Sequence, residues 1–164
     1  MKTIFFVRHA KSSWDDLRLP DHDRPLNNRG KSDAIAMGEY LVENASKIDI
    51  VISSSARRAK STAKRIDDLV NSENFIVEPK LYHASAREIF GVIANIHPEV
   101  ESALIVAHNP GMTDMINMFS EEDIINVPTA GVFKVDFDIN DWQEADTYNG
   151  KLDFFIYPKM LSHD

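Results

Sequence analysis

The chain has 164 residues, 43% of them apolar, and a formal net charge of −8. This length fits one domain, residues 1–164, which buries roughly two-thirds of the surface of the unfolded chain. The negative charge argues against a nucleic-acid binder, because positive fields capture phosphate backbones. The chain has no cysteine, which excludes disulfides, thiolate catalysis and thiolate metal sites.

The chain begins with a short apolar run, Ile4 to Val7, that ends abruptly at Arg8 and His9. Such a run predicts a buried strand. The two basic residues interrupt it long before a signal-peptide core or a membrane span would be complete, so we expect a cytoplasmic protein that does not contact membranes. They also follow the carboxyl end of the strand, where open α/β sheets place their binding crevice.

A long polar segment, from Ser12 to Arg29, follows this strand and includes Trp14 and the run from Asp21 to Arg24. Loops of this length in compact domains are often functional or act as lids. The alternative is a solvated connection with Trp14 packed beneath it. Turn and cap residues at its end then lead into a helix.

The remaining elements alternate between helices and strands. Helical spacing of apolar residues predicts helices through residue 43 and at about 56–70, 86–96 and 111–119, and apolar runs predict strands at 48–52, 75–77 and 103–107. Residues 131–137 and 150–157 alternate apolar and polar side chains, which is typical of antiparallel strands with one wet face. The predicted fold is a three-layer α/β sandwich with a mostly parallel central sheet, an antiparallel edge and helices on both faces.

The helix at about 56–70 has cations in its first turn, Arg57 and Arg58. Cations at a helix N-terminus oppose the helix dipole unless an anion binds nearby, so their position suggests a phosphate site. The buried side of this helix is predicted to carry Ala59, Ala63, Ile66 and Leu69.

A second buried strand also ends on a histidine. Residues 103–107 are apolar and lead directly into His108, Asn109, Pro110 and Gly111. Histidines at the ends of two buried strands can meet if the strands are neighbours.

Three motifs together resemble the histidine phosphatase superfamily, and within it the small SixA-type phosphohistidine phosphatases. The motifs are Arg8-His9-Ala10, Arg58-Ala59 followed by Thr62-Ala63, and His108-Asn109-Pro110-Gly111. Further similar stretches are Lys11-Ser12-Ser13-Trp14, Asp23-Arg24-Pro25-Leu26 with Arg29-Gly30, and Pro128-Thr129-Ala130-Gly131. Ala10 departs from the glycine that usually ends the first motif. The resemblance implies a phosphoglycerate mutase-like fold.

The resemblance also implies roles for the basic residues. His9 would attack phosphorus and form a phosphohistidine that water cleaves, and Arg8, Arg58 and His108 would bind the phosphoryl oxygens. Arg58 rather than Arg57 matches the family pattern, because alanine follows it. Asn109 would orient a ring or line the pocket. Two arginines and a histidine supply the charge that a metal provides elsewhere, so neither a metal nor another cofactor is expected.

One departure from the larger members of the superfamily bears on the substrate. Those enzymes carry a carboxylate general acid where this chain reads Leu81-Tyr82-His83-Ala84. An alkoxide leaving group needs a proton, whereas imidazole can leave a phosphoramidate in a neutral form. The missing acid favours phosphohistidine over sugar or glycerate phosphates. Possible substitutes are Asp21, His22, Glu78, His83 and Glu88, none at a defined spacing.

The sequence therefore predicts a metal-independent phosphohistidine phosphatase, a monomer that acts on a phosphorylated histidine-containing protein such as a phosphotransfer domain. Trp14 and Arg24, with Asp21 and His22, are expected to contact this partner. One alternative is a phosphatase for a small phosphate ester. Another is a module that binds phosphate or a phosphoprotein without turnover, although anion capture alone does not require a nucleophile such as His9.

Overall fold

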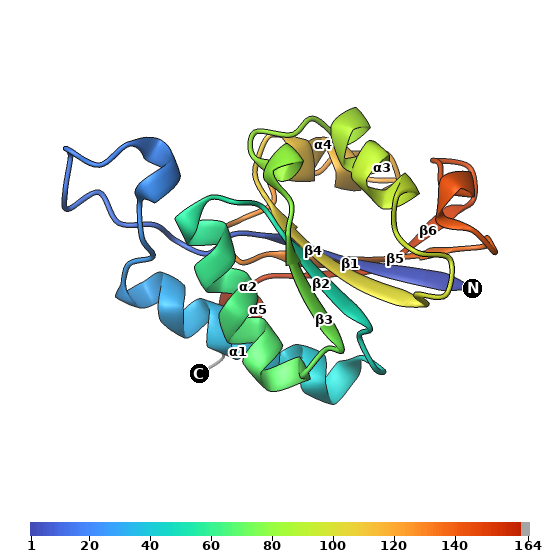
Figure 1. Ribbon diagram of the computed structural model, residues 1–164, viewed down its shortest axis with the longest axis horizontal. Helices are drawn as coiled ribbons and strands as arrows, with labels where there is room; N and C mark the ends of the chain where they lie inside the picture. Colours follow the sequence, from blue (N-terminus) through green and yellow to red (C-terminus); the bar gives the residue numbers. More distant parts are fainter. Residues whose placement is uncertain (162–164) are drawn as a thin grey trace.

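The computed structural model describes residues 1–161 and contains a six-stranded sheet in the order β3-β2-β4-β1-β5-β6 (Figure 1). The strands are β1 (Lys2–Arg8), β2 (Ile50–Ser53), β3 (Asn74–Val77), β4 (Ser102–Ala107), β5 (Val132–Phe137) and β6 (Gly150–Ile156). Strands β1 to β4 pair in parallel, and β5 and β6 continue the sheet in antiparallel pairing. The predicted parallel sheet with an antiparallel edge is confirmed.

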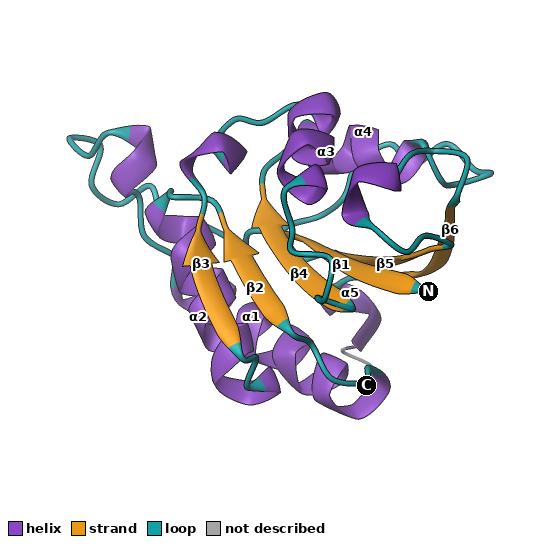
Figure 2. Ribbon diagram, turned by 45° about the vertical axis from the view of Figure 1, so that its right-hand side comes forward, coloured by secondary structure: helices purple, strands orange, loops and turns teal. Residues whose placement is uncertain are grey.

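Helices cover both faces of this sheet. They are α1 (Asn28–Asn44), α2 (Arg57–Val70), α3 (Ala86–Ala94), α4 (Gly111–Asn117) and the short α5 (Pro158–Leu161), with single 3-10 turns η1 (Asp21–Asp23), η2 (Pro79–Leu81) and η3 (Trp142–Glu144). Figures 1 and 2 show α1, α2 and α5 on one face and α3 and α4 on the other. This arrangement is the three-layer sandwich that the sequence predicts.

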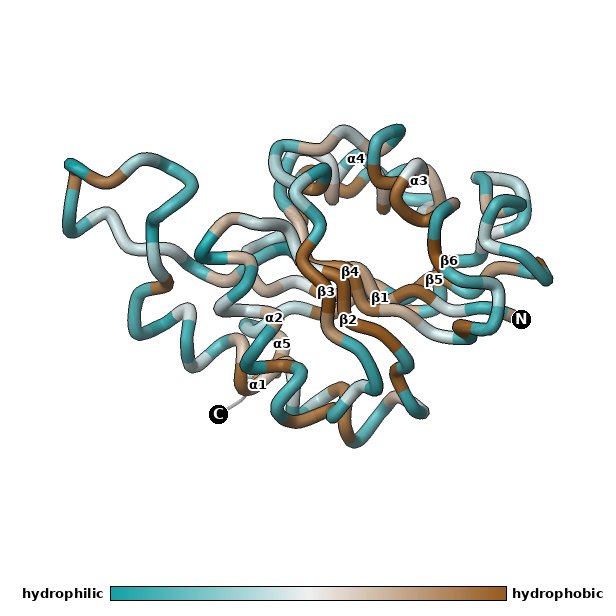
Figure 3. The backbone as a smooth tube through the Cα atoms, in the orientation of Figure 1, coloured by the Kyte–Doolittle hydropathy of each residue, from teal (hydrophilic) through white to brown (hydrophobic). Residues whose placement is uncertain are grey.

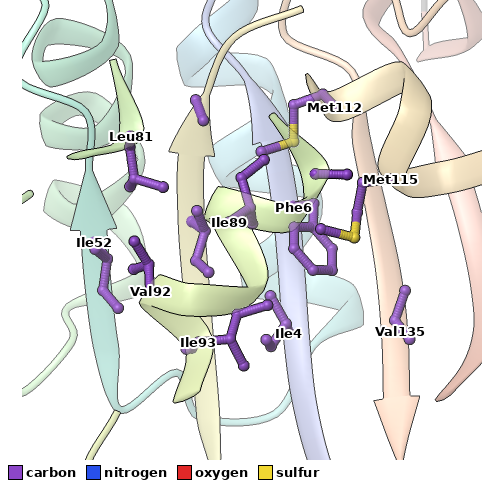
Figure 4. Packing of buried hydrophobic residues seen from close by; sticks show 14 of the residues in the cluster. Ile4, Phe6, Ile52, Leu81, Ile89, Val92, Ile93, Met112, Met115 and Val135 are labelled. Carbon is purple, nitrogen blue, oxygen red and sulfur yellow. The ribbon is translucent and has the colours of Figure 1, made fainter. Parts of the chain in front are cut away.

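The central strand β1 contributes to both halves of the core. Its side chains alternate between the two faces, so that Ile4 and Phe6 join the cluster under α3 and α4, whereas Phe5 and Val7 join the cluster over α1 and α2. Figure 3 shows the strands as the most apolar part of the chain, and Figure 4 shows the packing around Phe6. Burial on both faces explains why the first apolar run is continuous rather than alternating.

One predicted core position of α2 is wrong. Leu69 is 39% exposed, whereas Ala59, Ala63 and Ile66 are fully buried. A β-carbon added to Gly38 of α1 would lie 2.8 Å from the Leu69 Cδ1 atom, so Leu69 packs over the α1 backbone at the rim of the layer. Helical periodicity places a residue on a face but does not say how far the neighbouring layer extends over it.

The polar segment between β1 and α1 is fixed at its base. Ser12 forms an isolated antiparallel bridge with Leu26, and the Asn27 side chain caps α1 by accepting from the Gly30 N–H at 2.8 Å. Gly30 allows close approach, because a β-carbon there would lie 2.1 Å from the Lys11 carbonyl oxygen. Figure 1 shows the segment extending away from the sheet, and its turn η1 lies against α2.

Within residues 1–161, no helix combines the length and the apolar character needed to cross a membrane.

Candidate active site

The two histidines that end buried strands lie together. Strands β1 and β4 are parallel neighbours, with Arg8 paired to Ala107, so the residues that follow them reach the same edge of the sheet. The ring centroids of His9 and His108 are 5.1 Å apart. The predicted meeting of these histidines is therefore observed.

His9 is held in one tautomer by its own backbone neighbour. Its Nδ1 atom donates to the Ala10 carbonyl oxygen at 2.8 Å, which leaves a lone pair on Nε2. The side chain is buried, and burial is the main reason that the pKa of His9 falls to about 3. The nearby charges of Arg58 and Arg8 lower this pKa further, against the opposing effect of the Ala10 hydrogen bond. His9 thus presents a neutral ring with an unprotonated Nε2, as a nucleophile requires.

His108 is also buried and also has a pKa lowered to about 3, first by burial and then by the charges of His9 and Arg58. Its Nε2 atom lies 2.7 Å from the Ser54 hydroxyl, which in turn accepts from the Ala56 N–H at 3.3 Å. When Ser54 donates to Nε2, the proton of His108 resides on Nδ1, a buried atom with no hydrogen-bond partner among residues 1–161. The sequence pattern does not predict this contact of Ser54.

The two predicted arginines reach the same place from different elements. Arg8 ends β1 and donates from Nη1 to the Val127 carbonyl oxygen at 2.9 Å, while its buried Nε has no partner in the described part of the chain. Arg58 lies in the first turn of α2, is 4% exposed, and directs its Nε toward the His9 Nε2 atom at 3.4 Å. Buried donors without partners are rare in proteins, so Arg8 Nε is a candidate donor to an anion, as is His108 Nδ1 when it carries the ring proton.

Asp21, which the sequence suggested as a possible general acid and as a partner contact, also lies here. Asp21, in η1, accepts from Arg58 Nη2 at 3.0 Å and from the Tyr82 hydroxyl at 2.6 Å. Tyr82 follows η2, and its ring centroid is 5.5 Å from that of His108. Sequence spacing gives no signal for these contacts, because they depend on how the polar segment folds back.

Arg24 does not offer the free surface cation that was expected for partner contacts. Its side chain is buried, donates to the Ser12 hydroxyl at 2.6 Å and pairs with Asp21. Its guanidinium also stacks on the Trp14 ring at 3.7 Å. Arg24 therefore supports the polar segment from within, whereas Trp14 remains 63% exposed and available to a partner.

Asn109 acts as a link between loops. Its side-chain nitrogen donates to Asn126 and to the Val127 carbonyl oxygen, and its side-chain oxygen accepts from the Thr113 N–H and hydroxyl. Because Val127 also accepts from Arg8, Asn109 helps to place the acceptor that orients Arg8. Among residues 1–161, no group of three or more His, Asp or Glu side chains is arranged to hold a metal ion.

The low pKa values lead to a prediction for the free protein. We expect the rings of His9 and His108 to remain neutral from about pH 8 to about pH 5, whereas an unperturbed histidine gains its proton near 6.5. Nuclear magnetic resonance of ring nitrogens labelled with nitrogen-15 measures this directly, with a His9→Ala variant to assign the signals. Protonation of His9 near pH 6.5 would contradict the geometry described above.

Comparisons with known proteins agree with this geometry. Residues 4–101 match the family described as the histidine phosphatase superfamily (branch 1). An uncharacterized chloroplastic protein of Arabidopsis thaliana is 28% identical over 96% of this chain and 78% of its own length.

Among solved structures, a putative phosphohistidine phosphatase SixA from Nakamurella multipartitia has a TM-score of 0.83 at 21% identity and covers 96% of each chain. The protein histidine phosphatase SixA complexed with tungstate has a TM-score of 0.82 at 22% identity, over 98% of this chain and 99% of its own. These similarities show a shared fold. Together with the matched family and the paired histidines and arginines, they support a phosphatase, and the chain belongs to the histidine phosphatase superfamily.

Proposed function

We propose that this protein is a phosphohistidine phosphatase that works without a metal and through a phosphohistidine on His9. In the first step the substrate ring carries a proton on the nitrogen that is not phosphorylated. The His9 Nε2 lone pair attacks phosphorus, and the bond from phosphorus to the substrate ring breaks with its electron pair going to that ring, which leaves as neutral imidazole. In the second step water attacks phosphorus, and the electron pair of the breaking bond returns to His9 Nε2. Both protons of the water leave with the product as dihydrogen phosphate, which then ionises in solvent.

Three other residues stabilise the transferring group in this proposal. A phosphoryl group in transfer spreads negative charge over three equatorial oxygens, so fixed donors lower the barrier. Arg58 supplies a planar fork, and the free Nε of Arg8 and the free Nδ1 of His108 supply two more N–H groups. The site therefore places the positively charged guanidinium groups of Arg8 and Arg58 next to a neutral nucleophile.

The observation that favours phosphohistidine as substrate is that the Asp21 carboxyl group is ionised. Partial burial alone would raise the pKa of this carboxyl, but hydrogen bonds from Tyr82, Arg58 and Arg24 outweigh that effect and hold the pKa well below its usual range. The carboxylate that contacts Arg58 is therefore ionised and cannot protonate an alkoxide. A phosphohistidine that is protonated on its other ring nitrogen leaves as neutral imidazole and needs no proton from Asp21.

The partner in this proposal is a protein that presents phosphohistidine on its surface. Exposed Trp14 gives such a protein an apolar contact beside the site, and solved structures that share the fold are described as phosphohistidine phosphatases SixA. A single domain over residues 1–164, a monomeric state and a cytoplasmic location remain parts of the proposal.

The proposal is tested by comparing substrates in metal-free buffer containing a chelator. We expect a phosphohistidine protein and a small phosphoramidate to be hydrolysed with a kcat/KM at least about tenfold higher than sugar, glycerate or aryl phosphates, because only the esters need a general acid. A sugar or glycerate phosphate as the best substrate would show instead that this is a small-ester phosphatase. Phosphate binding without turnover of any substrate would show a binding module.

A further inference from the structure

The Asp21 carboxylate is fully engaged with donors from the protein. Its Oδ2 atom accepts from Arg58 Nη2 at 3.0 Å and from the Tyr82 hydroxyl at 2.6 Å. Its Oδ1 atom accepts from Arg24 Nε at 3.3 Å and Arg24 Nη2 at 3.2 Å. A carboxylate has about four lone-pair positions, so these donors leave none free for a substrate proton or an attacking water. Asp21 is therefore placed as an anion that organises its neighbours rather than as an acid or a base.

The same contacts occupy Arg58. All three guanidinium nitrogens donate within the protein: Nη1 to the Asp21 carbonyl oxygen at 2.7 Å, Nη2 to the Asp21 carboxylate at 3.0 Å, and Nε toward His9 at 3.4 Å. Nη1 and Nη2 each have one further N–H, so a phosphoryl group that binds Arg58 shares a guanidinium whose other N–H groups already donate to Asp21. Free phosphate and the Asp21 carboxylate therefore compete for one cation.

The charges around the site determine how strongly this competition affects phosphate binding. Among the described residues, Arg24 and Arg58 each form an ion pair with Asp21, whereas Arg8 has no carboxylate within ion-pair distance. Without Asp21, none of these three guanidinium groups would have an ion-pair partner within residues 1–161. Such a site would hold the phosphate product as well as the transition state, and tight binding of both does not accelerate turnover.

We infer that Asp21 is a resident counter-anion that positions the Arg58 guanidinium and competes with free phosphate for it, so that the product is held weakly. This inference rests on the proposed function only in taking phosphate as the anion of the site. It gives the polar segment between β1 and α1 a role in product release, through the single turn η1 that carries Asp21.

Asp21→Asn tests the inference, because it removes the charge and keeps the size and one acceptor. Isothermal titration calorimetry with inorganic phosphate, in metal-free buffer of low ionic strength, should show a Kd lowered by about threefold to tenfold, a range typical of a partly exposed charge. Product inhibition should tighten in parallel while kcat falls. The matched control is Asp23→Asn, which removes the same charge from the same turn, where the carboxylate is 58% exposed and lies 3.6 Å from His22 rather than beside an arginine.

A merely structural role predicts the opposite sign. If Asp21 only shaped the segment, Asp21→Asn would loosen Arg58 and weaken phosphate binding, and that result would overturn the inference. Equal tightening in Asp23→Asn would overturn it as well, by pointing to a general field effect. Because binding is measured without turnover, these outcomes are independent of which substrate the enzyme prefers.

A second variant provides an independent test in case Asp21→Asn fails to fold. Tyr82→Phe removes the hydroxyl that donates to Asp21 at 2.6 Å and leaves the carboxylate in place. With the carboxylate held less firmly, phosphate should compete better, and its Kd should fall by roughly twofold to threefold. An unchanged or higher Kd in Tyr82→Phe would contradict the inference.

Discussion

Replacing His9 with alanine is expected to reduce turnover of a phosphohistidine protein to the background rate while leaving phosphate binding largely intact. The reaction needs the lone pair that the Ala10 hydrogen bond leaves on His9 Nε2, and no neighbouring ring takes its place, because the Nε2 atom of His108 is bonded to Ser54. Phosphate binding depends on the arginines, whose charges do not require His9. Steady-state turnover and calorimetry with inorganic phosphate measure the two effects separately.

The matched control for this variant is His97→Ala. His97 lies at the opposite end of the sheet, next to the residues that precede β4, and its Nδ1 atom accepts from the Glu99 N–H. Its replacement should leave both turnover and phosphate binding unchanged. Undiminished turnover in His9→Ala would remove the nucleophile from the mechanism, and loss of phosphate binding would show that His9 shapes the anion site.

Replacing Arg58 with alanine should lower kcat/KM by on the order of 100-fold or more, which is typical of a preorganised transition-state donor. Arg58 is 4% exposed and directs its Nε toward the nucleophile, whereas its neighbour Arg57 is exposed and forms no ion pair within the described chain. Arg57→Ala is therefore the matched control and should cost at most a few-fold. Turnover of one phosphohistidine substrate across the variants measures the difference.

Arg58→Lys distinguishes charge from geometry. Lysine keeps the positive charge but cannot form the planar fork, so rescue should be poor. Full rescue by lysine would mean that Arg58 acts as a simple counter-charge. Equal losses in Arg57→Ala and Arg58→Ala would mean that the order of these two arginines along α2 does not decide which one serves the site.

The positions of His9 and His108 were predictable from the sequence, because each follows an apolar run that ends where its strand ends. The run from Ile4 predicts that His9 follows a buried strand, and the run from Ala103 predicts the same for His108. Parallel pairing of β1 with β4 then brings the two together. A different principle indicated Arg57 and Arg58 alike, because a cation in the first turn of a helix is unfavourable without an anion nearby, and the family resemblance then singled out Arg58.

Contacts made by the irregular segment were not predictable in the same way. Asp21 is 37 residues from Arg58 and 61 from Tyr82 in sequence, and no periodicity connects them. The same limit explains why Arg24 was expected at the surface. Residue type alone does not distinguish an exposed cation from one that stacks on Trp14 and donates a hydrogen bond inside a loop. Asn109 is similar: its position in the motif is clear, but its partners are set by the loop around Val127.

Trapping the phosphorylated enzyme tests the central claim most directly. Wild-type protein is mixed with a partner carrying labelled phosphohistidine, quenched at short times and mapped by peptide analysis. The mechanism predicts a label on His9 that is labile in acid and stable in base, that forms before phosphate is released, and that is absent from His9→Ala. Turnover with no label on His9 at any quench time, or with the label on another residue, would contradict it.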